Sequence, residues 1–94
     1  MGVGASGRFV RLQNVEERLV GDELFLVVPD DGQIHHLNSV GAGIWRLLGE
    51  PKSGAEIEQL LAAAYPDVAA DRIRGDIADL IEELLDLGLV TPAQ

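Results

Sequence analysis

Apolar residues in the first forty positions occur in short runs separated by turn formers, which is typical of β-strands. Residues 15–20 read as a weak strand, and residues 23–28 read as the strongest one because they are almost continuously apolar after the first position. Pro29-Asp-Asp-Gly32 predicts a hairpin turn in which the glycine adopts a positive φ. Residues 33–37 then return as a strand. We expect a three-stranded antiparallel meander with 23–28 in the centre and 33–37 at one edge.

After residue 37 the spacing of apolar residues becomes helical. Asn38 or Ser39 is expected to cap a first helix that runs to about Leu48. Ser53-Gly-Ala-Glu56 is a capping box, in which the serine and glutamate side chains each accept a hydrogen bond from the other residue's backbone amide. It starts a second helix that ends before Pro66. A small sheet followed by helices places the chain in the α+β class.

A third helix is predicted from about residue 70 to 87, with Gly88 as its C-terminal stop. At about 100° per residue, one set of apolar residues forms a compact stripe that we expect to face the core. A second set, Ile81 and Leu85, lies on one side of that stripe beside Arg74 and Ala78. This flank predicts a surface offered to a partner, although a wide core stripe explains it as well. The core stripe consists of Ile73, Ile77, Leu80, Leu84 and Leu87.

Length and composition indicate one domain, since the chain has 94 residues and 47% hydrophobic content. We expect residues 1–7, which are rich in glycine, to be disordered, residues 8–90 to form the domain, and residues 91–94 to be a tail. Residues 8–12 read as an extended lead-in. The chain shows neither a signal peptide nor an apolar run near the roughly 20 residues that span a bilayer. We therefore expect a cytoplasmic protein without membrane contact.

The charge of the chain narrows the choice of partner. Seven Lys and Arg residues stand against sixteen Asp and Glu residues, which gives a net charge of −9. Seven of the acids fall within residues 67–86, together with two arginines. Nucleic-acid binding depends on cations that neutralise phosphates, so we expect no nucleic-acid partner. A basic or neutral peptide is a better electrostatic match, and solubility alone also explains the acids.

No group of residues predicts catalysis, a metal site or a cofactor. His35 and His36 are neighbours on a strand, so their side chains point to opposite faces and do not readily share one ion. The chain has no cysteine, and Gly41-Ala-Gly43 lacks the lysine and hydroxyl residue of a phosphate-binding loop. The carboxylates of the third helix lie on an open polar face without a cleft to shift their pKa. Trp45 is expected in the core, and we expect no enzyme.

Three segments of the chain, within roughly residues 15–90, resemble the PqqD-like proteins. These segments are Leu37-Asn38 with Ile44-Trp45-Arg-Leu-Leu48, then Ser53-Gly-Ala-Glu-Ile-Glu-Gln-Leu-Leu61, and finally Asp76-Ile-Ala-Asp-Leu-Ile-Glu-Glu-Leu-Leu-Asp-Leu-Gly-Leu-Val90. The resemblance implies a winged helix-turn-helix-like fold with a three-stranded antiparallel sheet followed by three helices. It also implies a non-catalytic protein that binds the leader of a ribosomally synthesised precursor peptide and presents it to a peptide-modifying enzyme.

The resemblance further implies where the leader binds. In the family, the leader adds as a strand to the third strand of the sheet and packs against the third helix. On this sequence, the strand comprises Gln33, Ile34, His35, His36 and Leu37, and the helix flank comprises Arg74, Ala78, Ile81 and Leu85. We expect backbone bonds to give affinity and the flank to give selectivity, with Arg74 available to a leader carboxylate. Two alternatives stay open, namely a homodimerisation module that uses the same surfaces, and DNA binding, which the acidic third helix disfavours.

Overall fold

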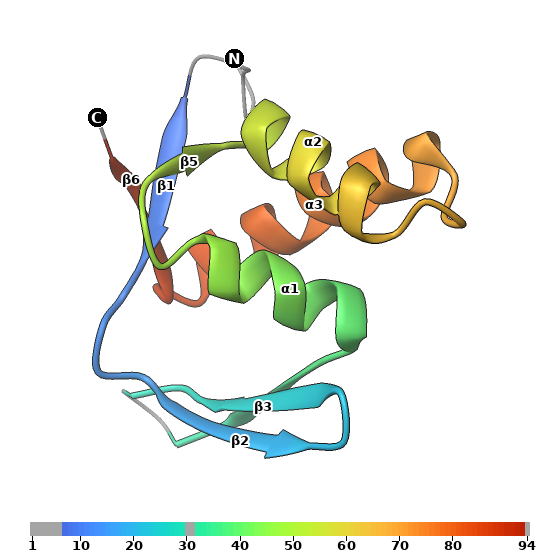
Figure 1. Ribbon diagram of the computed structural model, residues 1–94. Coiled ribbons are helices and arrows are strands. Elements are labelled where there is room, and N and C mark those ends of the chain that lie inside the picture. The colour runs from blue at the N-terminus through green and yellow to red at the C-terminus, as the bar shows by residue number, and fades with distance from the viewer. Residues whose placement is uncertain (1–6, 30–31, 94) are drawn as a thin grey trace.

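The computed structural model describes residues 7–29 and 32–93, which form two small antiparallel sheets and three helices (Figure 1). The first sheet has the order β2-β3-β4, and the second has the order β5-β1-β6. In Figure 1, α1 lies over the first sheet, with α2 and α3 on its other side and the second sheet at one end of the helices. The elements are β1 (Arg8–Arg11), β2 (Glu16–Val20), β3 (Glu23–Val27), β4 (Ile34–Leu37), α1 (Ser39–Leu47), β5 (Lys52–Ser53), α2 (Gly54–Ala64), α3 (Ala70–Asp86) and β6 (Val90–Ala93).

The first sheet confirms the predicted meander. Strand β3 is central, and its side chains Leu24 and Leu26 are buried against the helices. Gly21 and Gly32 both adopt positive φ angles of 65° and 70°, which permits the tight returns of the chain. Residues 30 and 31 of the predicted hairpin turn lie outside the described residues. Strand β4 therefore forms one edge of the sheet, as the sequence predicts.

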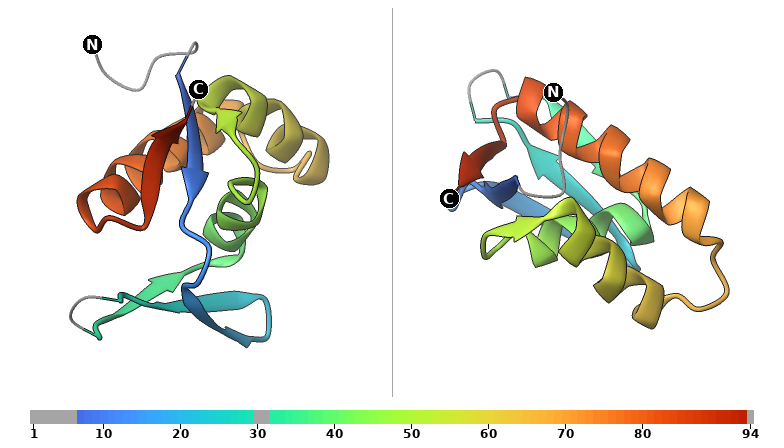
Figure 2. Two further views of the ribbon diagram at one scale, coloured as in Figure 1. Left: turned by 90° about the vertical axis from the view of Figure 1, so that its left-hand side faces the viewer. Right: turned by 90° about the horizontal axis from the view of Figure 1, so that it is seen from above.

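The second sheet was not predicted from the sequence. Strand β1 lies in its centre, between β5 and β6 (Figure 2, left), and Arg8 is the register partner of both Ser53 and Ala93. The prediction that residues 91–94 are a tail is wrong for 91–93, because these residues belong to β6. The predicted disorder of residues 1–7 concerns mainly residues 1–6, which lie outside the described residues.

The ends of the helices follow the sequence signals closely. Asn38, rather than Ser39, caps α1, because its Oδ1 accepts a hydrogen bond of 2.8 Å from the Gly41 amide. The predicted capping box of α2 is present in full. Helix α3 ends in a Schellman motif, in which the Leu89 amide donates to the Leu84 carbonyl and Gly88 adopts a φ of 73°. This motif turns the chain directly into β6.

The core lies between the first sheet and the helices and contains Trp45, as expected. Its indole Nε1 donates a hydrogen bond of 2.8 Å to the Glu17 carboxylate on β2, and the Arg11 guanidinium stacks over its ring at 5.3 Å from the centroid. These contacts join α1 to β2 and to the end of β1. No helix in residues 7–29 and 32–93 has both the length and the apolar content needed to cross a membrane.

Candidate functional site

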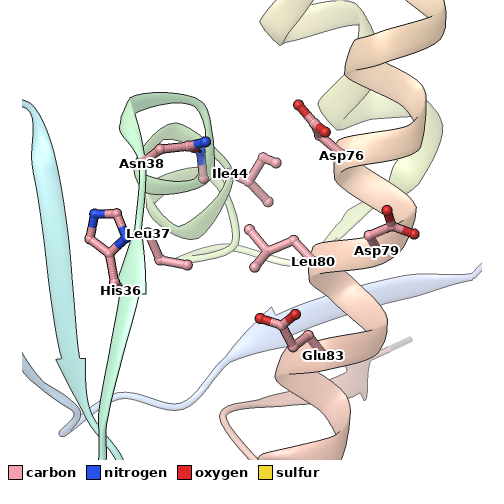
Figure 3. Close-up of a pocket in the computed structure, with 9 residues that line it drawn as sticks. His36, Leu37, Asn38, Ile44, Asp76, Asp79, Leu80 and Glu83 are labelled. Carbon is pink, nitrogen blue, oxygen red and sulfur yellow. Dashed lines mark hydrogen bonds between the residues drawn. The ribbon is translucent and has the colours of Figure 1, made fainter.

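A groove runs between strand β4 and helix α3, and we call it the β4–α3 groove (Figure 3). Figure 3 shows Leu80 of α3 pointing toward Leu37 and Ile44, so that the floor of the groove is apolar. Its cavity of about 170 Å³ is similar to the roughly 150 Å³ cavity that admits one benzene ring. The groove therefore has room for one large side chain of a ligand. Its lining residues are His36, Leu37, Asn38, Gly41, Ile44, Asp76, Asp79, Leu80 and Glu83.

The start of α1 determines how close the walls of the groove come. A Cβ atom on Gly41 would lie 3.3 Å from the Leu37 Cβ and 3.5 Å from a Leu80 methyl group. The first distance is tighter than ordinary van der Waals contact, so a side chain here would push α1 away from β4. Gly41, which weakens the helix by propensity, is thus explained by the close packing of α1 on β4.

Strand β4 supplies the other wall of the groove. It pairs with β3 through the register Leu24↔Leu37 to Val27↔Ile34, and within the described residues no second strand covers its outer edge. An exposed edge strand presents backbone N–H and C=O groups that another extended chain can bind. The backbone of β4 and the apolar floor therefore lie side by side in one site.

The two histidines lie on opposite faces of β4, as the sequence predicts. His35 faces the helices, and its Nε2 lies 2.8 Å from Glu83 Oε1 on α3. His36 faces the other side, where its Nε2 lies 2.7 Å from Glu23 Oε1 and its ring stacks at 4.9 Å from Phe25. Within residues 7–29 and 32–93, no group of three or more His, Cys, Asp or Glu residues could hold a metal ion. His35 instead links β4 to α3 at the groove.

The predicted binding flank of α3 differs from the face of α3 that lines the groove. Ile81 has 0% exposure and belongs to the core, so the prediction that it lines an open flank is wrong. Leu85 is half-buried against the core, and Ala78 is exposed, but neither lines the β4–α3 groove. The residue that does so is Leu80, which the sequence placed in the core stripe.

Arg74 also lies away from the groove. Its guanidinium is 3.3 Å from a carboxylate oxygen of Glu58 on α2 and 3.3 Å from one of Asp71. The hydrogen bond to Glu58 and then the charges of Glu58 and Asp71 raise the pKa of Arg74. This arginine therefore joins α3 to α2 on the surface, and it does not line the β4–α3 groove.

The helical geometry explains why the sequence pattern favours the flank of Leu85 over the edge that lines the groove. The apolar arc of α3 is wide and has two edges, with Leu80 toward one edge and Leu85 at the other, roughly 140° apart. Width alone does not tell which edge meets the sheet. The edge that lines the groove has Leu80 between Asp76 and Glu83, at i−4 and i+3, and an ordinary amphipathic helix has the same pattern.

Comparison with known proteins identifies the family. Residues 23–90 match the family model described as "Coenzyme PQQ synthesis protein D (PqqD)". The chain belongs to the PqqD family. This match extends from β3 to the start of β6, so it includes every residue that lines the β4–α3 groove. No curated protein matches the chain.

One solved structure is similar to this PqqD-family chain over most of its length. It is described as "TbiB1 in Complex with the TbiA(beta) Leader Peptide". The two chains are 28% identical, the match covers 86% of this chain and 93% of that chain, and the TM-score is 0.70. The PqqD resemblance and the α+β winged-helix-like fold, both expected from the sequence, are thereby confirmed, with the second sheet as an addition.

Proposed function

We propose that this PqqD-family protein binds the leader of a ribosomally synthesised precursor peptide as an added strand on β4. The observation that carries the proposal is the β4–α3 groove, where the outer edge of β4, which no strand covers within the described residues, lies beside an apolar floor. The family match supports it, and so does the similar chain TbiB1, which is in complex with a leader peptide. The protein then presents the precursor to a modifying enzyme and performs no chemistry on it. We propose that it acts in the cytoplasm, where the precursor is synthesised.

The geometry of the groove supplies both parts of the recognition. Backbone hydrogen bonds to β4 hold an extended peptide with little demand on its sequence. Every second side chain of the added strand then faces α3, and one of them can pack on Leu37, Ile44 and Leu80. Micromolar affinity corresponds to about −8 kcal/mol. Burial of a few apolar side chains at about 1.5–3 kcal/mol each, less the cost of ordering the peptide, reaches that value.

The structure leads us to revise the set of proposed contact residues. On the strand side, the proposal keeps Gln33, Ile34, His35, His36 and Leu37. On the helix side, it replaces Arg74, Ala78, Ile81 and Leu85 by the residues of α3 that line the groove, which are Asp76, Asp79, Leu80 and Glu83.

An NMR titration of the ¹⁵N-labelled chain tests the proposal. The ligand is the leader of a short peptide encoded beside this gene, and a scrambled version of the same peptide is the control. We expect saturable amide shifts in residues 33–37 and 76–83. Shifts centred on Arg74, Ala78 and Leu85 would restore the flank predicted from the sequence. Equal amide shifts with the leader and the scrambled peptide would refute leader recognition. So would the absence of amide shifts when the titration is repeated with the purified enzyme encoded beside this gene.

A homodimer is the second candidate, because the edge of β4 could pair with the same edge of another copy. Ile34 on this strand is 62% exposed, which favours a contact of this kind. The net charge of −9 on each copy, with three carboxylates lining the groove, opposes it. Sedimentation equilibrium without peptide separates the two. A monomer at the concentration used in the NMR titration supports leader binding. A dimer that the leader cannot dissociate supports a homodimerisation module.

A further inference from the structure

The α3 side of the β4–α3 groove carries negative charge on both sides of its apolar contact. Asp76 precedes Leu80 by four residues and Glu83 follows it by three. Figure 3 shows these three side chains extending from α3 toward β4 and α1, whereas Asp79 extends away from β4. A ligand side chain that packs on Leu80 therefore lies between two carboxylates.

The basic side chains that contact these carboxylates, Arg72 and His35, do not line the groove. None of the nine lining residues is a lysine or an arginine, and three of them are carboxylates. Asp76 has Arg72 at 3.8 Å, outside the lining, and the side chain of that arginine is largely exposed to solvent. Glu83 lies 2.8 Å from His35, and this contact holds its carboxylate toward β4. The groove is thus electronegative within a chain that already has a net charge of −9.

The spacing of the two acids suits an added strand. Along the helix axis, Leu80 is about 6 Å from Asp76 and about 4.5 Å from Glu83, at about 1.5 Å per residue. Side chains on one face of an extended peptide recur about every 6.8 Å. When one of them packs on Leu80, the side chain two residues away comes beside Asp76 or Glu83.

We infer that the β4–α3 groove selects leader segments in which a lysine or arginine stands two residues from an apolar anchor. The inference rests on the proposed function and adds the chemical class of the bound segment. Complementary charge favours a cationic side chain at this position, and an acidic side chain there is repelled by both carboxylates. A second copy of this chain is a poor occupant because it brings the same net charge of −9.

Selection from a displayed library of short random-sequence peptides tests this inference on the complete chain. We expect the recovered peptides to carry Lys or Arg two positions from an apolar residue and to shift the amides of 34–37. Their affinity should fall about tenfold for the double variant Asp76→Asn/Glu83→Gln. The matched control is Glu82→Gln/Asp86→Asn, which removes the same two charges from exposed positions of α3 that do not line the groove. This control should change the affinity less than about twofold.

Three results would overturn the inference. An equal loss for both double variants would mean that peptides sense only the net charge. Peptides that shift β4 but carry no basic residue would refute the charge selection and leave the proposed function intact. Failure of all peptides to shift β4 would overturn both. Thermal unfolding of each variant excludes loss of fold as the cause. A charge exchange provides further support if Glu83→Lys prefers the Lys→Glu version of a selected peptide.

Discussion

Leu80 is the side chain through which α3 contributes apolar surface to the β4–α3 groove, and it is half-buried in the free protein. We expect Leu80→Gln to weaken leader binding at least tenfold, because burial of a leucine is worth about 1.5–3 kcal/mol and tenfold corresponds to about 1.4 kcal/mol. Isothermal titration calorimetry measures the change.

The matched control for that prediction is Leu60→Gln on α2, where the leucine is 45% exposed and does not line the groove. It replaces the same residue type without altering the site, so leader affinity should stay unchanged. Equal weakening by both variants would show that the apolar floor of the groove has no specific role.

The contribution of Glu56 in the capping box to the stability of the protein depends on pH in a predictable way. The hydrogen bond from the Ser53 amide has the largest effect and lowers the pKa of Glu56 below its ordinary value of 4.5. Desolvation, the next largest effect, opposes this lowering, and the charge of Arg8 adds to it. A folded pKa below the unfolded one stabilises the protein above the unfolded pKa, and this stabilisation is lost as the pH falls through the folded pKa. We expect Glu56→Ala to destabilise the protein at pH 7 and to have a diminishing effect below about pH 4.

Urea unfolding of the wild type and Glu56→Ala at several pH values measures this difference. The two midpoints should converge as the solution is acidified. A difference that grows toward low pH would contradict the assigned role of the carboxylate. Ser53→Ala provides a comparison, because loss of the serine cap should cost about 1 kcal/mol.

At the scale of elements, the sequence predicted correctly those elements that depend on contacts between residues close together in the chain. The meander β2-β3-β4 is joined by short turns, and the caps at Asn38 and Ser53 involve residues three positions apart. The second sheet escaped prediction because its partners are distant in sequence, with Arg8 beside both Ser53 and Ala93. Short strands of this kind acquire their conformation from pairing rather than from propensity.

Removal of residues 91–94 tests whether β6 is an integral strand. The truncation leaves β1 without most of its pairing to β6, and β1 carries the buried Phe9. We expect the melting temperature to fall by at least about 4 °C, which corresponds to about 1 kcal/mol in a domain of this size. Differential scanning calorimetry measures the shift. An unchanged melting temperature would mean that residues 91–94 do not contribute to stability and behave as a tail.

The candidate site was predictable to a different degree on its two sides. The edge strand followed from the order of the predicted strands, and the strand predicted at 33–37 forms one border of the sheet as β4, Ile34–Leu37. The helix side was less predictable because the rotation of α3 depends on tertiary packing. Ile81 lies in the core and Leu80 faces the groove, which periodicity alone does not decide when the apolar arc is wide.

At the scale of the whole molecule, the net charge of −9 predicts how leader binding responds to salt. The Debye length falls from about 30 Å at 0.01 M to about 3 Å at 1 M ionic strength, so long-range attraction of a basic leader is screened. We expect the association rate to fall steeply over this range and the dissociation rate to change less, because backbone bonds and apolar contacts hold the bound peptide. Stopped-flow fluorescence of a labelled peptide separates the two rates.

A salt-independent association rate would show that the acidic surface does not guide the peptide. A peptide of the same length whose basic residues are replaced by glutamine is the control, and its association should vary little with salt.

The pairing of β1 with β6 has a consequence for how the chain could be rebuilt. Arg8 and Ala93 are register partners in adjacent strands, and Figure 1 shows these strands away from β2 and β3. A short loop could join residue 93 to residue 8, and new chain ends could open between α2 and α3. Such a circular permutant would keep every strand pairing while its elements follow one another in a different order. The continuity of the backbone and the architecture of the groove are therefore separable properties of this domain.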